Sequence, residues 1–508
     1  MSIWNNITRE TFSEFLREKV GSFEIKSSVY RYGTVESTQD TVVRVSGLAG
    51  CRYGEILQFG NDIYGLALDL SEEYIGAVLL NENTNVVAGT LARGTGKTAD
   101  ICVGETVLGR VIDPFGRPLD GKPLSTVETR NLEQRAPSII DRAPVKRPLE
   151  TGILAIDSMI PIGRGQRELI IGDRQTGKTT IALAAIRNQQ PDDIICIYCA
   201  IGQKASTTAR IVHEHTQAGR MENTIFVVSS AGDSPAIQYL TPFAGCAIAE
   251  HFMQEGHDVL IVYDDLSKHA VAYRTMSLLL QRPAGREAYP GDIFYLHSRL
   301  LERSAQLSPE LGGGSMTALP IVETIGGDIS AYIPTNIISI TDGQIYLSSE
   351  LFFAGMRPAI NLGLSVSRIG SSAQHNAIKW IGGRLRLAIS QYREIAIFSQ
   401  FGTEVDAATS KQIHRGERMQ EALKQAQDES YSVSEEVVLL LALAHGTFYS
   451  MELHEIESAK KALLAYIRAA HPGSLHAIQT TGNLNTEESE TLKKAFAGFL
   501  EEYVNAGE

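Results

Sequence analysis

The chain has no long hydrophobic run, few cysteines and no excess of positive charge. Its longest nearly continuous apolar run covers residues 437–444, whereas a membrane-spanning helix needs about 20 apolar residues. A net charge of −13 argues against a nucleic-acid-binding role for the whole surface, because such surfaces carry an excess of Lys and Arg. We therefore expect no nucleic-acid partner, and contact with a membrane only through partner proteins.

The five cysteines are scattered and odd in number, which favours a reducing compartment over a disulfide framework. Cys196 and Cys199 match the C-x-x-C spacing of redox and zinc motifs, but they lie within an apolar run at residues 194–201. We interpret both as core cysteines of a buried strand. The N-terminus lacks an apolar core flanked by basic residues, so no secretory signal is expected.

The most informative segment is GDRQTGKT at residues 172–179, which fits the phosphate-loop pattern G-x-x-x-x-G-K-S/T. A strand-like run, residues 169–171, precedes it, and a helix-like run, residues 180–188, follows. In this context backbone N–H groups and the helix N-terminus cradle phosphate. The motif assigns Lys178 to the terminal phosphates and the Thr179 hydroxyl to Mg²⁺. The predicted phosphate-binding residues are Gly172, Asp173, Arg174, Gln175, Thr176, Gly177, Lys178, Thr179 and Thr180.

A second GKT sequence, at residues 96–98, lacks this context. Leu91 stands where the first glycine of the motif belongs, and no helix-like run follows. We interpret residues 94–98 as a turn between strands rather than a phosphate site.

The 508 residues suffice for two to four domains, and the pattern changes three times along the chain. Residues 1–26 contain an amphipathic helix at 8–20, which either docks on a partner or packs on its own domain. Residues 27–95 carry short β-rich runs separated by Gly, Asn and Asp, which predict a small antiparallel barrel. The expected strands are residues 41–45, 55–59, 64–68, 75–80 and 85–88.

Residues 96–380 alternate strands with helices, and the apolar runs 194–201, 224–228 and 259–263 suit a central parallel sheet. Residues 381–508 read as helical. The segment SVSE at 432–435 is typical of a capping box. Near the end, apolar side chains recur at helical spacing at Leu492, Phe496, Phe499, Leu500 and Tyr503. The predicted fold is a multidomain α/β protein with an N-terminal β-barrel, a central P-loop domain and a C-terminal α-helical domain.

Three features bear on chemistry at the phosphate loop. The strand-like run 259–263 ends in acid, and we predict Asp264 as the Mg²⁺-shell contact, with Asp265 second. Hydrolysis needs a further group to activate water, often a Glu at the end of the strand next to the P-loop strand. We take that strand to be the one ending at Gln203, whose amide can orient water but cannot accept its proton. The tight segment 363–370 carries Arg368, which is either a surface arginine or a group that stabilises phosphoryl charge across a subunit interface.

These segments resemble the alpha-subunit family of the F-type, rotary ATP synthases. The resemblance runs nearly from end to end, and it is carried by residues 172–180, 200–204, 263–268, 272–274, 282–292, 297–303, 312–318, 332–344, 357–370 and 391–394.

The resemblance implies an N-terminal barrel, a central RecA-like nucleotide domain and a C-terminal helical domain. It implies a ring of three alpha and three beta subunits around a gamma shaft, with a delta-type stalk subunit contacted through the N-terminal helix. It also implies that ATP or ADP with Mg²⁺ binds without turnover, because Gln203 stands where the beta subunit has its catalytic Glu. The expected location is the cytoplasmic face of a bacterial plasma membrane or the stromal face of a plastid thylakoid.

Several residue roles come only from the resemblance. Arg368 matches the arginine that reaches into the neighbouring beta site, and Ser365 matches a position linked with activity. Gln425 and Gln427 match residues lining the adenine pocket, where Arg357 and Pro358 lie nearby. Ala205 replaces the usual Arg, and residues 33–45 depart from the usual barrel pattern, but neither change touches the phosphate loop.

Two other function classes stay open at this stage. A self-sufficient ATPase, such as a beta-like ring subunit or a type III secretion ATPase, would carry Glu in place of Gln203. An RNA-translocating hexameric helicase would need a basic groove and stacking aromatics on the barrel, which the acidic composition and helical C-terminal region oppose.

Overall fold

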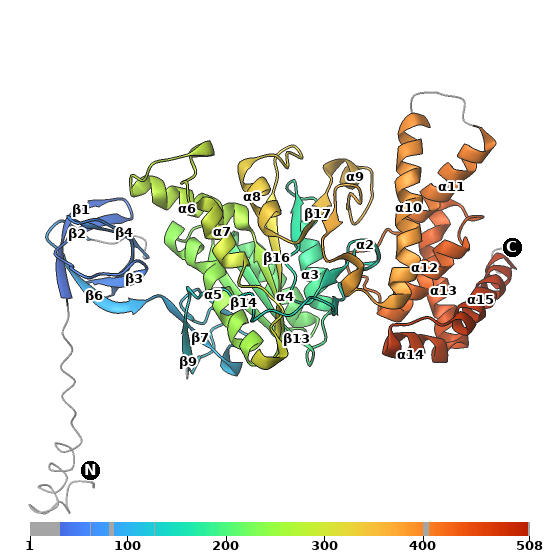
Figure 1. The fold of residues 1–508 in the computed structure, drawn as a ribbon, viewed down its shortest axis with the longest axis horizontal. Helices are drawn as coiled ribbons and strands as arrows, with labels where there is room; N and C mark the ends of the chain where they lie inside the picture. The colour runs from blue at the N-terminus through green and yellow to red at the C-terminus, as the bar shows by residue number, and fades with distance from the viewer. Residues whose placement is uncertain (1–30, 61, 81–85, 126–127, 400–405, 506–508) are drawn as a thin grey trace, which may run out of the picture.

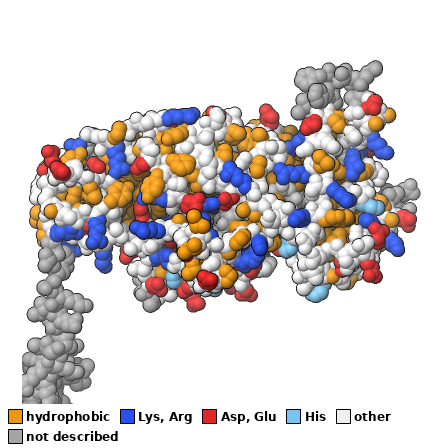
Figure 2. All heavy atoms as spheres, viewed as in Figure 1, with side chains coloured by type: hydrophobic (Ala, Val, Ile, Leu, Met, Phe, Trp, Pro, Cys, Tyr) orange, Lys and Arg blue, Asp and Glu red, His pale blue; other side chains and the backbone are white. Residues whose placement is uncertain are grey.

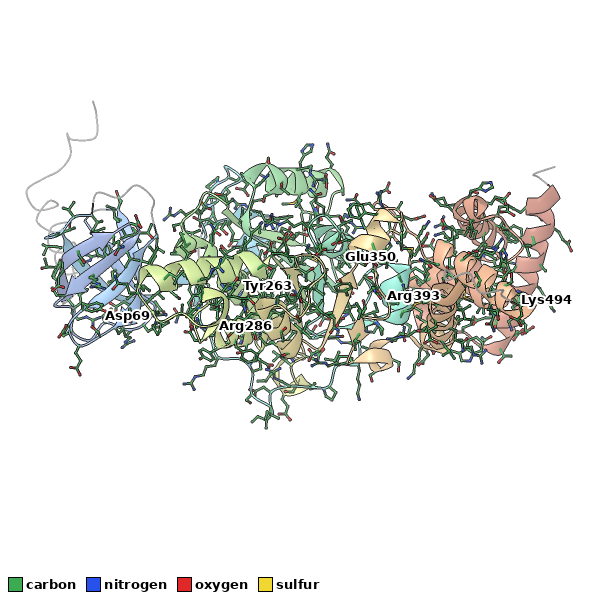
Figure 3. The ribbon with its side chains drawn as sticks, turned by 90° about the horizontal axis from the view of Figure 1, so that it is seen from above. Asp69, Tyr263, Arg286, Glu350, Arg393 and Lys494 are labelled. Atoms are coloured by element: carbon green, nitrogen blue, oxygen red, sulfur yellow. The ribbon has the colours of Figure 1, made fainter. Side chains whose placement is uncertain are left out.

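The computed structural model describes residues 31–60, 62–80, 86–125, 128–399 and 406–505. The helix expected at residues 8–20 lies outside this part of the chain. The described residues form three bodies in line, a barrel, an α/β domain and a helical domain (Figure 1). Seen from above, Asp69 lies in the barrel, Tyr263 in the central domain and Lys494 in the helical domain (Figure 3). The predicted fold class is therefore confirmed.

The barrel closes by antiparallel pairing in the order β1-β2-β5-β4-β3-β6. Its core holds side chains from alternate positions, such as Val43 and Val45, and Leu57 and Phe59. The strands are β1 (Arg31–Gln39), β2 (Val42–Ser46), β3 (Glu55–Phe59), β4 (Ile63–Leu70), β5 (Ile75–Leu79) and β6 (Leu91–Thr98).

Two local predictions in the barrel are wrong. Residues 86–88 form no strand: Gly89, with φ 90°, donates its N–H to Val35, so this segment is a turn before β6. The GKT sequence at 96–98 lies within β6 and not in a turn. Gly96 N donates to Oε1 of the buried Glu55 at 2.9 Å, so this N–H serves the barrel and not a phosphate.

The central sheet has eight strands in the order β18-β17-β12-β16-β15-β13-β14-β8, all paired in parallel except β18 with β17. Helices α3 and α4 pack on one face, and α5 to α8 on the other (Figure 1). The strands are β8 (Val111–Ile112), β12 (Leu169–Gly172), β13 (Ile194–Gln203), β14 (Thr224–Ser230), β15 (Asp258–Asp264), β16 (Ser315–Glu323), β17 (Gly343–Leu347) and β18 (Val366–Ser367). The helices are α2 (Leu154–Met159), α3 (Lys178–Asn188), α4 (Ala205–Gln217), α5 (Pro235–Gln254), α6 (Leu266–Leu279), α7 (Ile293–Leu301), α8 (Tyr332–Ile340) and α9 (Ser349–Phe353). Two short pairs, β7 (Asp100–Val103) with β9 (Glu128–Asn131) and β10 (Pro148–Leu149) with β11 (Ile162–Gly163), lie outside it.

Helices on both faces explain why the central strands are apolar throughout. On β13, Cys196 belongs to the core on one face and Cys199 to the core on the other, and both are free thiols. Side chains three positions apart on a strand point to opposite faces, so this C-x-x-C cannot act as a pair. The prediction of core cysteines is confirmed.

The position of β13 corrects the sequence-based topology. Strands β16 and β15 separate β13 from the P-loop strand β12, so Gln203 does not end the neighbouring strand. The strand that follows the P-loop strand in sequence is thus three places away in space, and β16, which comes much later, takes a place beside β12. Strand order in a parallel sheet depends on long crossovers, which local pattern does not specify.

The helical domain contains α10 (Asn376–Ser399), α11 (Ala407–Ala422), α12 (Val433–His445), α13 (Ile456–Ala470), α14 (Pro472–Thr481) and α15 (Thr486–Asn505). The capping box of Ser432 and Glu435 is present, and Leu492, Phe496 and Phe499 are buried as their spacing predicts. The domain boundaries at 26, 95 and 380 stay predictions; β6 runs on to Thr98 and α10 begins at Asn376. No helix in the described ranges is long and apolar enough to cross a membrane.

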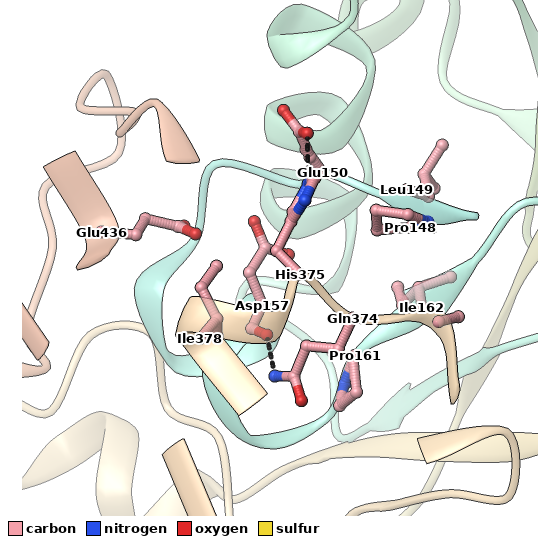
Figure 4. Close-up of a pocket in the computed structure, with 11 residues that line it drawn as sticks. Pro148, Leu149, Glu150, Asp157, Pro161, Ile162, Gln374, His375, Ile378 and Glu436 are labelled. Atoms are coloured by element: carbon pink, nitrogen blue, oxygen red, sulfur yellow. Dashed lines mark hydrogen bonds and ion pairs between the residues drawn. The ribbon is translucent and has the colours of Figure 1, made fainter. Parts of the chain in front are cut away.

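The helical domain meets the central domain at two buried carboxyl groups, Asp157 of α2 and Glu436 of α12 (Figure 4). Burial raises the pKa of Asp157 to about 6, and the hydrogen bonds that it accepts from Thr151 N, Thr151 Oγ1 and Gly152 N favour its ionised form. Burial raises the pKa of Glu436 well above its ordinary value, and Asp157 raises it further. Burial beside the Asp157 carboxyl group therefore favours a proton on Glu436, shared by the two neighbouring groups.

The change Glu436→Gln tests this shared proton. The folded chain keeps a proton that the unfolded chain releases above its ordinary pKa of 4.5, so stability contributed by Glu436 is lost as pH rises. The amide of Gln donates at any pH. We expect thermal unfolding between pH 6 and 8 to show a smaller loss of stability with rising pH in Glu436→Gln than in the wild type. The exposed control Glu501→Gln keeps the wild-type slope, and an unchanged slope in Glu436→Gln contradicts the shared proton.

Candidate functional site

A cavity of about 600 Å³ lies at the carboxyl end of the sheet. It is bounded by the phosphate loop on one side and by the segment that joins α11 to α12 in the helical domain on the other. The loop leaves β12 at Gly172, where a Cβ would lie 2.5 Å from the carbonyl oxygen of Leu347. Gly177, with φ 99°, is the N-cap of α3 and turns the backbone toward the cavity. The lining residues are Ile153, Gln175, Thr176, Gly177, Lys178, Thr179, Thr180, Ile181, Ala184, Gln203, Asp264, Asp265, Glu323, Phe352, Arg357, Pro358, Ala359, Gln425, Ala426, Gln427 and Glu429.

Lys178 is the cation of the phosphate end. Its Nζ donates to the carbonyl oxygens of Gly172 at 2.9 Å and Asp173 at 2.5 Å, so it lies folded against the loop. Burial lowers the pKa of Lys178, while the carboxylates of Glu323, Asp265 and Asp264 oppose the shift. A phosphate group is the natural partner for this ammonium and for the N–H groups at the start of α3.

Asp264 joins three elements at the metal end. Its Oδ2 accepts from the hydroxyls of Thr179 at 2.8 Å and Tyr198 at 2.5 Å, and its Oδ1 accepts from Gln203 Nε2 at 2.9 Å. Burial raises the pKa of Asp264, and these hydroxyl donors lower it. Asp265 instead caps α6 by accepting from Lys268 N, and burial followed by Asp264 raises its pKa to about 7. The order predicted for the metal contact, Asp264 before Asp265, stays a prediction; of the two carboxylates, Asp264 is the one in contact with the Thr179 hydroxyl.

A hydroxyl and a carboxylate in contact fit a Mg²⁺ ion whose remaining ligands are phosphate and water oxygens. Within the described residues, no group of three or more His, Cys, Asp or Glu side chains forms a cage of protein ligands. The donor set of Thr179 and Asp264 therefore suits Mg²⁺ that arrives with a nucleotide.

Gln203 reaches the cavity although its strand is not beside β12. Its Nε2 donates to both the main-chain oxygen and Oδ1 of Asp264, at 3.1 and 2.9 Å. Its Oε1 accepts from Lys268 Nζ at 2.8 Å. Both ends of the amide are thus engaged, and no group on Gln203 can take a proton from water.

The far end of the cavity is formed by residues from two domains. Gln425 is buried, and its amide donates to Gly152 O at 2.7 Å and accepts from Leu154 N at 3.1 Å. Gln427 is exposed at the rim. The Arg357 guanidinium lies 5.1 Å from the ring centroid of Phe352, next to Pro358. These planar groups around an open slot suit the base of a nucleotide.

Three predicted phosphate-loop residues lie outside the cavity lining. Gly172 packs under Leu347. Asp173 accepts from Thr324 Oγ1, Gly327 N and Ser349 Oγ, so it fixes the outer side of the loop. Arg174 forms an exposed ion pair with Glu323 at 2.9 Å. These residues shape the loop rather than face its contents.

Arg368 and Ser365 also lie apart from this cavity, at the β18 edge of the sheet. Ser365 is buried, accepts from Tyr346 N at 2.9 Å and donates to Asn361 O at 2.7 Å. Arg368 is exposed, and its side chain donates to Ile338 O at 3.3 Å. The sequence-predicted residues thus separate into a cavity group and an edge group.

Sequence reasoning missed Glu323, Phe352 and Glu429 as cavity residues. Glu323 ends β16, the strand that is next to β12, and its carboxylate is paired with Arg174. An acid at a strand end was a usable signal for Glu323. Phe352 and Glu429 sit on a short helix and a turn, where no pattern distinguishes them.

Comparison with known proteins agrees with this geometry. Residues 152–367 match the family model for the ATP synthase alpha/beta family, nucleotide-binding domain, and residues 374–499 match the ATP synthase alpha/beta chain, C terminal domain. The chain belongs to the ATP synthase alpha/beta family. Relatives named ATP synthase subunit alpha are 52% identical: that of Acetivibrio thermocellus covers 97% of this chain and 98% of its own, and that of Clostridium botulinum covers the same shares. That of Caldanaerobacter subterraneus, also 52% identical, covers 99% of both chains.

The cavity draws on both matched domains of the ATP synthase alpha/beta family. The phosphate and metal ends come from the nucleotide-binding domain, and Gln425 and Gln427 come from the C-terminal domain. A nucleotide bound here would touch both domains.

Lys178→Met tests the phosphate end. The change removes the ammonium but keeps most of the buried stem, so we expect Mg-ATP affinity to fall about tenfold to hundredfold, the worth of a charged hydrogen bond. Equilibrium titration of the purified chain measures it. The matched control is Lys97→Met in the other GKT sequence, which is exposed on the barrel and should leave affinity unchanged. Equal losses in the two variants contradict the assignment.

Proposed function

We propose that the chain is the non-catalytic, nucleotide-binding alpha subunit of a rotary F-type ATP synthase. In the complex, ATP synthesis or hydrolysis is coupled to proton or sodium transport. The observation that carries this proposal is the amide of Gln203, which is engaged at both ends beside Asp264 in a complete Mg-nucleotide cavity. The chain binds ATP or ADP with Mg²⁺ and does not turn it over.

Different cavity residues bind different parts of the nucleotide. The loop from Gln175 to Thr180 and Lys178 hold the phosphates, and Thr179 with Asp264 hold the Mg²⁺ shell. Arg357, Pro358, Gln425 and Gln427 surround the base. Asp173 and Arg174 support the loop from behind. Mg²⁺, when bound, neutralises the phosphate charge that Lys178 alone cannot balance.

Arg368 acts in a neighbouring site. It is exposed at the sheet edge, and the guanidinium lies outside the lining of its own cavity. Ser365 holds the turn that presents it, through Tyr346 N and Asn361 O. An exposed guanidinium on a fixed turn suits transition-state phosphoryl charge in a beta subunit packed against this edge.

The partners follow from the same proposal. Three copies alternate with three beta subunits around the gamma shaft, and the N-terminal segment docks on a delta-type stalk subunit. The complex holds this chain at the cytoplasmic face of a bacterial plasma membrane, or at the stromal face of a thylakoid. Of the alternatives, the helicase has little support: on the face in Figure 2, basic and acidic side chains are interspersed, without a continuous basic groove.

Co-purification tests the assembly. We expect the chain to be isolated with an equal amount of a second P-loop subunit that carries Glu in place of Gln203. The complex should hydrolyse ATP while the purified chain alone should not. Steady hydrolysis by the chain alone would overturn the non-catalytic assignment and would make Glu323, a cavity carboxylate at the end of β16, the first candidate for the catalytic base.

Arg368→Lys in the assembled complex tests the trans arginine. Lys keeps the charge but loses the planar fork, so turnover should fall by about 10³-fold while nucleotide affinity of the complex changes little. Steady-state hydrolysis and nucleotide titration on one preparation separate the two effects. Arg384→Lys, an arginine stacked on Trp380 at 4.9 Å, serves as the control. Unchanged turnover in Arg368→Lys contradicts the role.

A further inference from the structure

The segment 423–430, which we term the wall segment, joins α11 to α12 and closes the base end of the cavity. From the central-domain side it is held by hydrogen bonds to Gly152 and Arg357: Gln425 Nε2 donates to Gly152 O, and Gln425 N donates to Arg357 O at 2.9 Å. Tyr431 N, at the end of the segment, also donates to Gly152 O at 3.2 Å. These contacts fix the chain at Gln425 and directly after the segment, at Tyr431.

The start of the segment is also held by a buried cation. Lys460 of α13 is 1% exposed, and its Nζ donates to Ala422 O at 3.0 Å and Lys424 O at 2.5 Å. Its ammonium also lies 5.9 Å from the ring centroid of Tyr431. Ala422 is the last residue of α11, so Lys460 satisfies carbonyl groups at a helix C-terminus and lies at the negative end of the helix dipole.

Burying the charged side chain of a lysine in a core costs free energy. Burial lowers the pKa of Lys460, because the charged form loses its water, and the carboxylates of Glu429 and Glu457 only partly oppose this. Its neighbours on α13, Leu463 and Leu464, are buried at no such cost. Unlike an apolar side chain, the ammonium makes directional hydrogen bonds. These fix the backbone carbonyl groups of Ala422 and Lys424, shortly before Gln425.

We propose that Lys460 is a positioning residue for nucleotide binding, which fixes the wall segment so that the base end of the cavity is formed before the nucleotide arrives. The inference rests on the proposed nucleotide-binding function. It adds a residue on α13, outside the cavity lining, to those that determine affinity. Lys460 touches no nucleotide and acts through the backbone of Ala422 and Lys424.

This role predicts an effect on one end of the ligand only. Without the ammonium, the carbonyls of Ala422 and Lys424 lose their donor, and ordering the wall segment becomes a cost of binding. The phosphate end stands on β12 and α3, whereas the hydrogen bonds of Lys460 go to Ala422 and Lys424. A ligand with a base should therefore bind more weakly, and a ligand of phosphates alone should not.

The experiment compares Mg-ATP with Mg-tripolyphosphate on the full-length chain. For Lys460→Met we expect Mg-ATP affinity to fall about tenfold or more, and Mg-tripolyphosphate affinity to stay within about twofold. The matched control is Lys461→Met, whose lysine is exposed on the same helix and pairs with Glu457 at 2.8 Å; both affinities should stay unchanged. Lys460→Arg, which keeps charge and donors, should recover most of the Mg-ATP affinity.

The outcomes separate the possibilities. Unchanged Mg-ATP affinity in folded Lys460→Met overturns the positioning role alone. Equal losses for both ligands mean general destabilisation and also overturn it. Wild-type chain that binds no Mg-ATP overturns the proposed function and this inference with it. If Lys460→Met does not fold, Lys460→Gln decides, because its amide is uncharged and its side chain is too short to bond both carbonyls: weaker Mg-ATP with unchanged tripolyphosphate supports the role, and unchanged Mg-ATP overturns it.

Discussion

The carboxylate of Asp264 is the interaction on which the nucleotide site depends. It receives hydrogen bonds from Thr179 at the start of α3, Tyr198 within β13 and Gln203 at the end of β13. Two segments, the start of α3 and strand β13, therefore meet at one buried side chain of β15. A buried carboxylate without these donors would be too costly, so the donors and the acid require one another. Their shared geometry aligns the phosphate loop with the metal position.

Much of the fold and of the nucleotide site could be predicted from the sequence. The loop at residues 172–179, the acid pair at the end of β15 and the three-part fold follow from local pattern, since each is encoded in consecutive residues. The order of the strands could not, because β16 enters between β12 and β15 through a crossover that leaves no local trace. That is why Gln203 was expected on the neighbouring strand, and why Glu323 was missed.

The barrel shows the same limit in smaller form. Residues 86–88 have the alternation of a strand, with Val86 buried and Val87 exposed, yet the turn at Gly89 takes them out of the sheet. The second GKT sequence has the letters of a phosphate loop but lies in β6, where Glu55 accepts the N–H of Gly96. Whether a backbone N–H is free to bind phosphate depends on its hydrogen-bond partner in the folded chain, and the sequence motif alone does not specify that partner.

The base end adds a different constraint, because it is built where two domains meet. The side-chain amide of Gln425 forms hydrogen bonds with the backbone of Gly152, Leu154 and Glu429. It therefore holds the domains together rather than presenting free polar groups. Glu436 and Asp157 add a second link from the helical domain to the segment that begins at Thr151. A helical domain tied at two places favours a cavity of constant shape. Constant shape suits a site that holds its nucleotide, whereas a site that turns nucleotide over must open and close, and this contrast agrees with the engaged amide of Gln203.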